Sequence, residues 1–206
     1  KMVATDSYRL AVKSARGDEL KGVGDDGGWQ VIVPARALQE LNRMLEPGED
    51  RPGVMVRASE QQIVFEVGGY TLVSRLIEGQ FPNYTRVIPG EAERTIQVAR
   101  ADLLAAIKRA AIVARAEASK LVFRTQEGTL TISAESGDVG RAHEELAATV
   151  EGEEMEIAFN AEYLTDVLGV MDSETVIWEF TGPLSSGLLK ASDDPDYLYV
   201  VMPMQL

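Results

Sequence analysis

The stretch Ile96-Gln-Val-Ala-Arg-Ala-Asp-Leu103 decides the fold, because its pattern occurs three times in the chain. Val31-Ile-Val-Pro-Ala-Arg-Ala-Leu38 precedes it and Ile157-Ala-Phe-Asn-Ala-Glu-Tyr-Leu164 follows it. In each copy a short strand pattern is followed, a few residues later, by a leucine. The leucines lie 65 and then 61 residues apart, so the spacing predicts a repeating unit of roughly 60 residues.

Each of these leucines begins an amphipathic helical pattern. Mostly apolar residues recur three, four and seven positions later, which places them on one face of a helix. They are Leu41, Asn42 and Leu45 in the first copy, Ala106, Ile107 and Ala110 in the second, and Val167, Leu168 and Met171 in the third. We therefore expect one helix entered through Pro34 and two further helices over 100–115 and 161–171.

Strand patterns surround these helices, with Gly68-Gly69 and Glu127-Gly128 as hairpin turns and Ser136-Gly-Asp138 as a further turn. The expected strands are 29–33, 54–58, 62–67, 70–77, 94–98, 120–125, 128–134, 141–150, 155–159, 175–181, 185–191 and 197–202. Each unit is thus a strand, a helix and three strands. Hairpin-length connections imply antiparallel sheets with the helices on one face, an α+β fold.

Three segments are expected to connect or precede these units. Residues 3–13 predict a turn followed by a strand in which Tyr8, Leu10 and Val12 alternate. Residues 22–28 contain GxG without a GxGxxG spacing or a Walker lysine, which predicts a flexible loop. Residues 46–53 are expected to end the first helix, and residues 78–90 read as a domain linker.

Length, composition and charge exclude several classes of protein. With 206 residues and 45% hydrophobic content, the chain can bury the cores of two domains, and it has neither an 18-residue apolar run nor a signal-peptide pattern. The absence of cysteine excludes disulfides and thiolate metal sites and indicates a cytoplasmic protein. A net charge of -13 argues against coating nucleic acid by bulk electrostatics.

The charge is nevertheless segregated. Residues 94–120 hold six basic and two acidic residues, a net of +4 in a chain of -13. On a helical wheel Lys108 and Arg115 point away from the core stripe, and Arg36 and Arg43 take the same outward position on the first helix. On the third helix the outward residues are Glu162 and Asp166. Two of the three helices thus offer a cationic outer face, whose alternative explanation is an ordinary solvated surface.

A catalytic constellation is absent from the sequence. The only histidine, His143, stands beside two glutamates, which is typical of a polar strand edge. The acidic stretches 151–154 and 193–196 lack the spacing of a Ca²⁺ loop. We therefore expect no enzymatic activity, no metal and no cofactor.

Three motifs carry a resemblance to a known family. Ala4-Thr-Asp-Ser-Tyr-Arg-Leu10, Phe81-Pro-Asn-Tyr-Thr-Arg-Val87 and the apolar ending Tyr199-Val-Val-Met-Pro-Met-Gln-Leu206 resemble the beta subunit of the bacterial replicative DNA polymerase, the sliding clamp. The resemblance covers the whole chain. It implies a processivity factor without chemistry of its own, in which two subunits of three domains each close into a ring around duplex DNA.

The resemblance also implies what the outer helix faces do. Arg36, Arg43, Lys108 and Arg115 would face DNA without reading its sequence, and Ile112 with Val113 would pack against the neighbouring subunit. The chain has three such helices rather than six. We therefore expect a shortened chain that holds the remainder of the middle domain, about 1–88, and the last domain, about 92–206, and is mostly monomeric.

A cleft between the middle and last domains of the family accepts a short linear motif that ends in Leu and Phe. Polymerases, the clamp loader and repair proteins carry this motif and bind the cleft through it. The matching positions here are Thr5, Tyr8, Arg9, Leu10, Pro82, Arg86, Val87, Val200, Val201, Met202, Pro203 and Met204, with Asn160, Tyr163 and Ser186 also implied. Tyr8 stands where the family often has His, and Gln205 where it often has Arg.

Two other classes of function compete with a sliding clamp. A peptide-binding scaffold unrelated to DNA would keep the cleft and make the cations on the helices incidental. A hydrolase would need a metal held by the acidic loops, and the sequence shows no such site. Neutralising Lys108 and Arg115 would separate the clamp from the scaffold, because only a clamp uses these cations.

Overall fold

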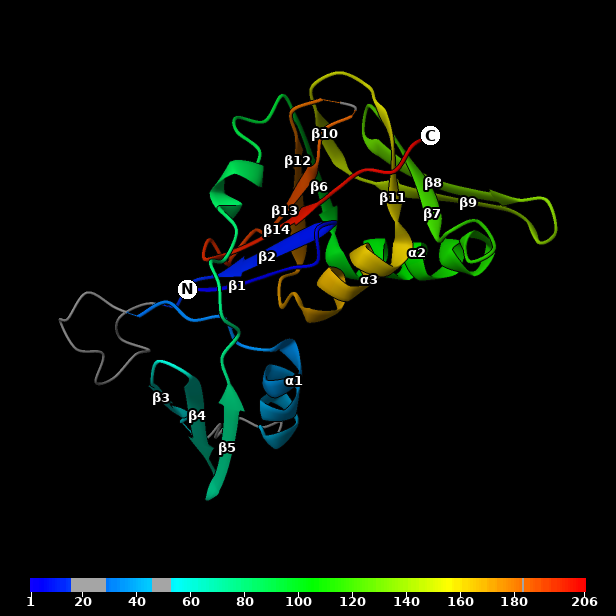
Figure 1. Ribbon diagram of the computed structural model, residues 1–206. Coiled ribbons are helices and arrows are strands. Elements are labelled where there is room, and N and C mark those ends of the chain that lie inside the picture. Colours follow the sequence, from blue (N-terminus) through cyan, green and yellow to red (C-terminus); the bar gives the residue numbers. More distant parts are fainter. Residues whose placement is uncertain (16–28, 46–52, 183) are drawn as a thin grey trace. The chain divides into compact units, whose positions relative to one another are not determined.

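The computed structural model describes residues 1–15, 29–45, 53–182 and 184–206 (Figure 1). The loop expected at 22–28 and most of the helix stop expected at 46–53 lie outside these residues. The chain forms two compact units, one of Lys1–Leu20 with Tyr84–Leu206 and the other of Lys21–Asn83.

The larger unit contains two antiparallel sheets (Figure 1). The order of the seven-stranded sheet is β1 (Met2–Thr5), β2 (Arg9–Lys13), β14 (Tyr197–Val201), β13 (Gly187–Ala191), β12 (Thr175–Phe180), β6 (Arg94–Ala99) and β10 (Thr149–Glu151). The strand order of the four-stranded sheet is β11 (Glu156–Asn160), β7 (Lys120–Gln126), β8 (Thr129–Ser136) and β9 (Gly140–Ala147). The helices are α2 (Arg100–Ala114) and α3 (Ala161–Val170). These elements confirm the predicted α+β class.

The two repeats of this unit exchange their first strands. One repeat runs β6, α2, β7, β8, β9 and the other β11, α3, β12, β13, β14. β6 pairs with β12 of the other repeat, with Ile96 opposite Trp178. β11 pairs with β7, with Ile157 opposite Phe123. Neither repeat therefore completes its sheet alone, and both contribute to one core.

That core is built from the predicted helical stripes and an aromatic cluster. Leu103, Ala106, Ile107 and Ala110 of α2 are fully buried, as are Leu164 and Leu168 of α3. Phe123, Phe159, Trp178 and Phe180 pack together with ring centroids 5.1 to 6.2 Å apart. Gly187 is required beside them, because a Cβ there would lie 2.4 Å from Nε1 of Trp178.

Arg100 ties the two helices together. Its Nη1 donates to the carbonyl of Leu168 at 3.0 Å and its Nε to the carbonyl of Ser173 at 2.8 Å. Carbonyls near the end of a helix lack intrahelical partners and carry partial negative charge, so a guanidinium there satisfies and stabilises them. Arg100, at the start of α2, thus caps the end of α3.

The smaller unit contains α1 (Ala35–Met44) and the meander β3 (Met55–Ala58), β4 (Gln62–Val67) and β5 (Tyr70–Arg75). Its buried residues include Ala37, Ile63, Phe65 and Val67. The predicted turn at Gly68-Gly69 is confirmed, because Val67 pairs with Tyr70 and both glycines have positive φ, 56° and 83°. Such φ values cost glycine little.

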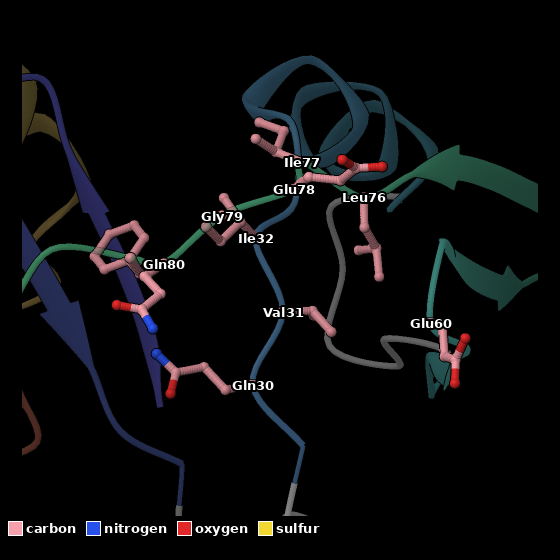
Figure 2. A pocket seen from close by; sticks show the side chains of 10 residues that line it. Gln30, Val31, Ile32, Glu60, Leu76, Ile77, Glu78, Gly79 and Gln80 are labelled. Atoms are coloured by element: carbon pink, nitrogen blue, oxygen red, sulfur yellow. The ribbon is translucent and has the colours of Figure 1, made fainter.

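A hollow of about 520 Å³ lies in this smaller unit (Figure 2). Figure 2 shows Val31 and Ile32 on one segment alongside Leu76 and Ile77 on another. The N–H of Ile77 donates to the carbonyl of Ile32 at 2.9 Å. The residues that line the hollow are Gln30, Val31, Ile32, Glu60, Leu76, Ile77, Glu78, Gly79, Gln80 and Phe81. The lining mixes apolar side chains with two glutamates and two glutamines, without a catalytic arrangement.

Several local predictions are wrong. Residues 29–33 are not a strand, since the single bond between Ile77 and Ile32 does not make a ladder. The turn expected at the start of residues 3–13 is instead the strand β1, which spans Met2–Thr5, and the turn follows at Asp6, where Ser7 has a φ of 77°. The stretch 141–150 divides at Ala148, whose N–H donates to the carbonyl of Gly128. β10 beyond it joins the other sheet.

The first helix also departs from expectation. Of its predicted stripe, Asn42 is exposed and Leu38, Leu41 and Leu45 are only half-buried. Pro34 is the N-cap, one residue before the first helical turn. Residues 78–90, expected to be irregular, contain the 3-10 helix η1 (Tyr84–Val87).

Candidate functional site

The candidate binding surface is built on the pairing of β2 with β14. Leu10 lies opposite Val200, and both are buried with Val12 and Leu188. Tyr84 and Ile88 pack on this apolar cluster from outside, which places η1 on the same face of the sheet. Because alternate residues of a strand point to opposite faces, Arg9 and Val201 point to the other face, toward α3.

An aromatic wall stands on that other face. The ring of Tyr8 stacks on the ring of Tyr163 at a centroid distance of 6.3 Å and an interplanar angle of 28°. The guanidinium carbon of Arg9 lies 4.5 Å from the centroid of the Tyr163 ring. The hydroxyl of Tyr199 donates to the backbone carbonyl of Tyr163 at 3.0 Å. A cation over an aromatic face is attracted by the electrons of the ring, so Arg9 stabilises the wall.

The last residues of the chain are held by backbone hydrogen bonds to Tyr8, just before β2, and to β11. The N–H of Met202 donates to the carbonyl of Tyr8 at 2.9 Å, and the N–H of Met204 donates to the carbonyl of Ala158 at 2.7 Å. Met202 remains 46% exposed beside Tyr8, which is 61% exposed. The apolar ending thus leaves a methionine at the surface, next to the aromatic wall.

The structure separates the predicted peptide-binding residues by depth. Leu10, Val200 and Val201 are buried and can form only the floor of a site. Thr5, Tyr8, Arg86, Val87 and Met202 are exposed, while Arg9, Tyr163, Ser186, Pro203 and Met204 are half-buried. Arg86 and Val87 belong to η1. Pro82 is exposed and belongs to the smaller unit.

Two of the predicted residues have local structural tasks. Asn160 is the N-cap of α3, where its Oδ1 accepts the N–H of Glu162 at 2.8 Å. The hydroxyl of Thr5 donates to the carbonyl of Arg9 at 2.8 Å and helps to close the turn between β1 and β2. These contacts explain why such residues occur at these places whether or not they touch a ligand.

Three residues beside the aromatic wall were missed by sequence reasoning: Asp6, Asp166 and Tyr199. Arg9 donates to Asp6 from Nε at 2.8 Å and to Asp166 from Nη1 at 2.6 Å. The helical pattern identified Asp166 only as an outward residue of the third helix. Its position one turn after Tyr163 was the available signal, because residues three apart lie on one helix face. The partner strand could not be identified in this way.

The electrostatics follow from these contacts. Burial alone would raise the pKa of the Asp6 carboxyl, but hydrogen bonds from Arg9 and from the Tyr8 N–H hold the pKa below its ordinary value. Burial would lower the pKa of Arg9, yet its hydrogen bonds to Asp166 and Asp6 raise it. Burial raises the pKa of Tyr199 to about 12. At neutral pH the guanidinium is therefore charged and the Tyr199 hydroxyl is available as a donor.

A second candidate surface is the outer face of α2. Lys108 and Arg115 are exposed, and none of the ion pairs recorded for the described residues involves them. Arg109 lies between them in the sequence and forms a bidentate salt bridge with Glu144 of β9. Its Nε donates to Oε1 at 2.9 Å and its Nη2 donates to Oε2 at 2.6 Å. Ile112 is 64% exposed on the same helix.

Val113, next to Ile112 on α2, is half-buried against the core. Arg94 of β6, another basic residue of the stretch 94–120, pairs with Glu93 and Glu153. On α1 of the smaller unit, Arg36 is exposed and Arg43 pairs with Glu40 at 2.6 Å. Of the predicted DNA-facing residues, three are thus exposed and outside the ion pairs seen in the described ranges, and Arg43 is exposed but paired.

Family models match the chain in two consecutive parts. The model described as "DNA polymerase III beta subunit, C-terminal domain" matches residues 85–205, and the one described as "DNA polymerase III beta subunit, central domain" matches residues 1–83. The chain belongs to the DNA polymerase III beta subunit family. The two matched parts meet near the expected linker, whereas the compact units assign β1 and β2 to the larger unit. The expected domain boundary at 88–92 stays a prediction.

Individual members of the family agree with the assignment. The chain is 37% identical over 207 residues to the beta sliding clamp of Treponema pallidum, a match that covers 98% of the chain and 54% of the relative. A crystal structure of the sliding clamp from Pseudomonas aeruginosa has a TM-score of 0.89 at 34% identity, covering 99% of this chain and 54% of that one. A structure of the Pseudomonas aeruginosa clamp bound to griselimycin has a TM-score of 0.88 at 33% identity, with 99% and 54% covered.

The chain spans about half the length of the curated relatives it matches. In its described part, the helices are too short or too polar to cross a membrane. Among the same residues, His, Asp and Glu side chains do not gather in groups of three or more that could hold a metal ion.

Proposed function

We propose that this chain is part of a DNA sliding clamp, a non-catalytic processivity factor of the cytoplasm that tethers DNA polymerases to duplex DNA. The observation that carries the proposal is the surface at β2 and β14, where large apolar side chains are exposed. Tyr8 and Met202 lie beside these strands and are exposed, and so is Val87, the neighbour of Ile88, which packs on the buried cluster of Leu10 and Val200. Large apolar side chains exposed near one another are typical of a surface that binds a partner. Membership in the beta subunit family supports the same function.

The partner proposed for this surface is a short linear motif that ends in Leu and Phe. Motifs of this kind would come from polymerases, the clamp loader and repair proteins. Burying the two anchors would gain on the order of 1.5 to 3 kcal/mol each, and ordering the peptide would offset part of this. Exposed Met202 and half-buried Met204 suit several partners, because an unbranched thioether repacks easily. We expect a Kd in roughly the micromolar range.

DNA would be bound weakly and without sequence preference. Exposed Lys108 and Arg115 on α2 and Arg36 and Arg43 on α1 can each approach a phosphate, while the chain as a whole carries a charge of -13. A ring held on DNA by topology needs only such few contacts, and tighter binding would impede sliding. Exposed Ile112 is proposed to meet the neighbouring subunit in a homodimeric ring of the complete protein, whereas this chain alone would be mostly monomeric.

Deletion of Met202–Leu206 tests the proposal. Binding of a fluorescent Leu-Phe motif peptide, measured by polarisation, should be abolished, because Met202 and Met204 connect the aromatic wall to β11. Circular dichroism should show the helices retained, since α2 and α3 pack through residues outside the deletion. Val139→Ala removes an apolar side chain, 56% exposed, in the β8–β9 connection and should leave binding unchanged. Undiminished binding after the deletion would place the site elsewhere.

A further inference from the structure

Arg9 is enclosed by partners on three sides. Its Nε meets Asp6, its Nη1 meets Asp166, and its guanidinium carbon lies 4.5 Å from the centroid of the Tyr163 ring. Only 28% of the side chain is exposed. A carboxylate of a bound peptide would therefore have to displace a partner already present. This arrangement suits a residue that positions its neighbours better than one that contacts a ligand.

Asp166 connects elements that are distant in sequence. It lies 157 residues from Arg9, whereas Asp6 lies in the turn that immediately precedes Arg9. Asp166 and Tyr163 are one turn apart on α3, so they share a face of that helix. The hydroxyl of Tyr199 on β14 also reaches the carbonyl of Tyr163. Strands β2 and β14 and helix α3 are thus tied together at Tyr163.

We propose that Asp166 is a positioning residue of the peptide-binding surface, which holds Arg9 across the Tyr163 ring and so fixes the Tyr8–Tyr163 pair in place. The inference rests on the proposed function, because it assigns Asp166 a role at that same surface. A preformed wall saves the side-chain entropy that binding would otherwise lose in ordering the exposed ring of Tyr8 and the half-buried ring of Tyr163. Asp166 acts through Arg9 and need not touch the peptide.

The exposure of Asp166 makes the role testable apart from folding. Its side chain is 63% exposed, and ion pairs so open to solvent contribute little to stability. Removing its charge should therefore change the arrangement of the rings more than the stability of the unit. Asp172 provides a matched control, because it is an exposed aspartate two residues beyond α3.

The experiment compares Asp166→Asn with Asp172→Asn in the 206-residue chain. We expect the Kd for a fluorescent Leu-Phe motif peptide to rise about fivefold in Asp166→Asn, with a nearly unchanged thermal midpoint. Asp172→Asn should bind as the parent does. The NMR resonances of the Tyr8 and Tyr163 rings should shift in Asp166→Asn and stay in place in the control. An unchanged Kd, or an equal loss in both variants, would overturn the inference.

A double substitution separates action through Arg9 from direct contact. In an Arg9→Gln background, Asp166→Asn should cause no further loss of affinity, because the residue through which it acts is already gone. An additional loss would mean that Asp166 contacts the peptide itself and would refute a positioning role. If the parent chain binds no Leu-Phe peptide, the proposed function fails together with the inference. If the parent binds and Asp166→Asn binds equally well, only the inference fails.

Discussion

Helices α2 and α3 take the same place in two repeats, yet their outer faces differ. Both bury the same stripe, with Leu103 of α2 and Leu164 of α3 fully buried. Outside, α2 presents exposed Lys108 and Arg115, whereas α3 presents Asp166, which is paired with Arg9. The comparison teaches that packing preserves the inner face of a repeated element, while the outer face is free to serve different partners.

The largest effect should come from removing the cations. In the complete protein, changing Arg36, Arg43, Lys108 and Arg115 to Ala should weaken DNA association strongly at low salt. The salt slope should fall by about 0.9 for each phosphate that is no longer neutralised, because fewer counterions are released. Fluorescence anisotropy with duplex DNA over a range of salt concentrations measures both quantities.

The corresponding change on α3 is the control for this prediction. Glu162→Gln with Asp166→Asn removes two outward charges from the third helix and should leave DNA association no weaker than before. If the four alanines left DNA loading and sliding unchanged at low salt, the difference between the outer faces would have no role in binding DNA. A peptide-binding scaffold would then be the better description.

An intermediate effect is expected for the apolar side chain on the outer face of α2. Ile112→Asp should convert dimers of the complete protein to monomers, because a carboxylate buried in an interface costs more than isoleucine gains there. The free energy of unfolding of this chain should change by at most about 0.5 kcal/mol, since Ile112 is 64% exposed. Analytical ultracentrifugation and urea denaturation measure the two outcomes.

Val170 at the end of α3 is the matched control for Ile112. It is 75% exposed, so Val170→Asp should leave both assembly and stability unchanged. Equal loss of dimers in the two variants would remove the distinction between the helices. A stable dimer of this chain formed through α2 would also contradict the proposed arrangement, in which Ile112 meets a domain outside this chain.

The smallest effect concerns the pair between Arg109 of α2 and Glu144. The hydrogen bond from Arg109 lowers the pKa of Glu144 below its ordinary value of 4.5. A lowered carboxyl pKa stabilises the fold above the unfolded-state pKa, and this contribution disappears as the pH falls through the folded-state value. Glu144→Gln should therefore lower the thermal midpoint slightly at pH 7 and not at all well below pH 4.

Glu145, the exposed neighbour of Glu144 on β9, provides the control. Glu145→Gln should show no such pH-dependent difference from the parent. If Glu144→Gln lowered the midpoint equally at acid and neutral pH, the loss would reflect packing rather than ionisation. The ion pair between Arg109 and Glu144 would then not be evidence that charge on the outer face of α2 stabilises the fold.

The sequence by itself determined the parts of the fold that depend on local periodicity. The stripes of α2 and α3 were predicted residue by residue, because period 3.6 selects one face of a helix. The hairpins at Gly68-Gly69 and Glu127-Gly128 were predicted because positive φ favours glycine. Most strands of the larger unit were placed nearly to their ends, whereas β1 was missed and β9 and β10 were predicted as one strand. The family followed from three short motifs.

Only the tertiary structure decided which distant residues meet. The exchange of β6 and β11 between repeats, and the division of 141–150 at Ala148, depend on hydrogen bonds to strands far away in the chain. Residues 29–33 have the composition of a strand but lack a ladder, since a strand requires a partner as well as a pattern. In the same way Asp166, an outward charge by periodicity, becomes the partner of Arg9 because folding brings α3 beside β2.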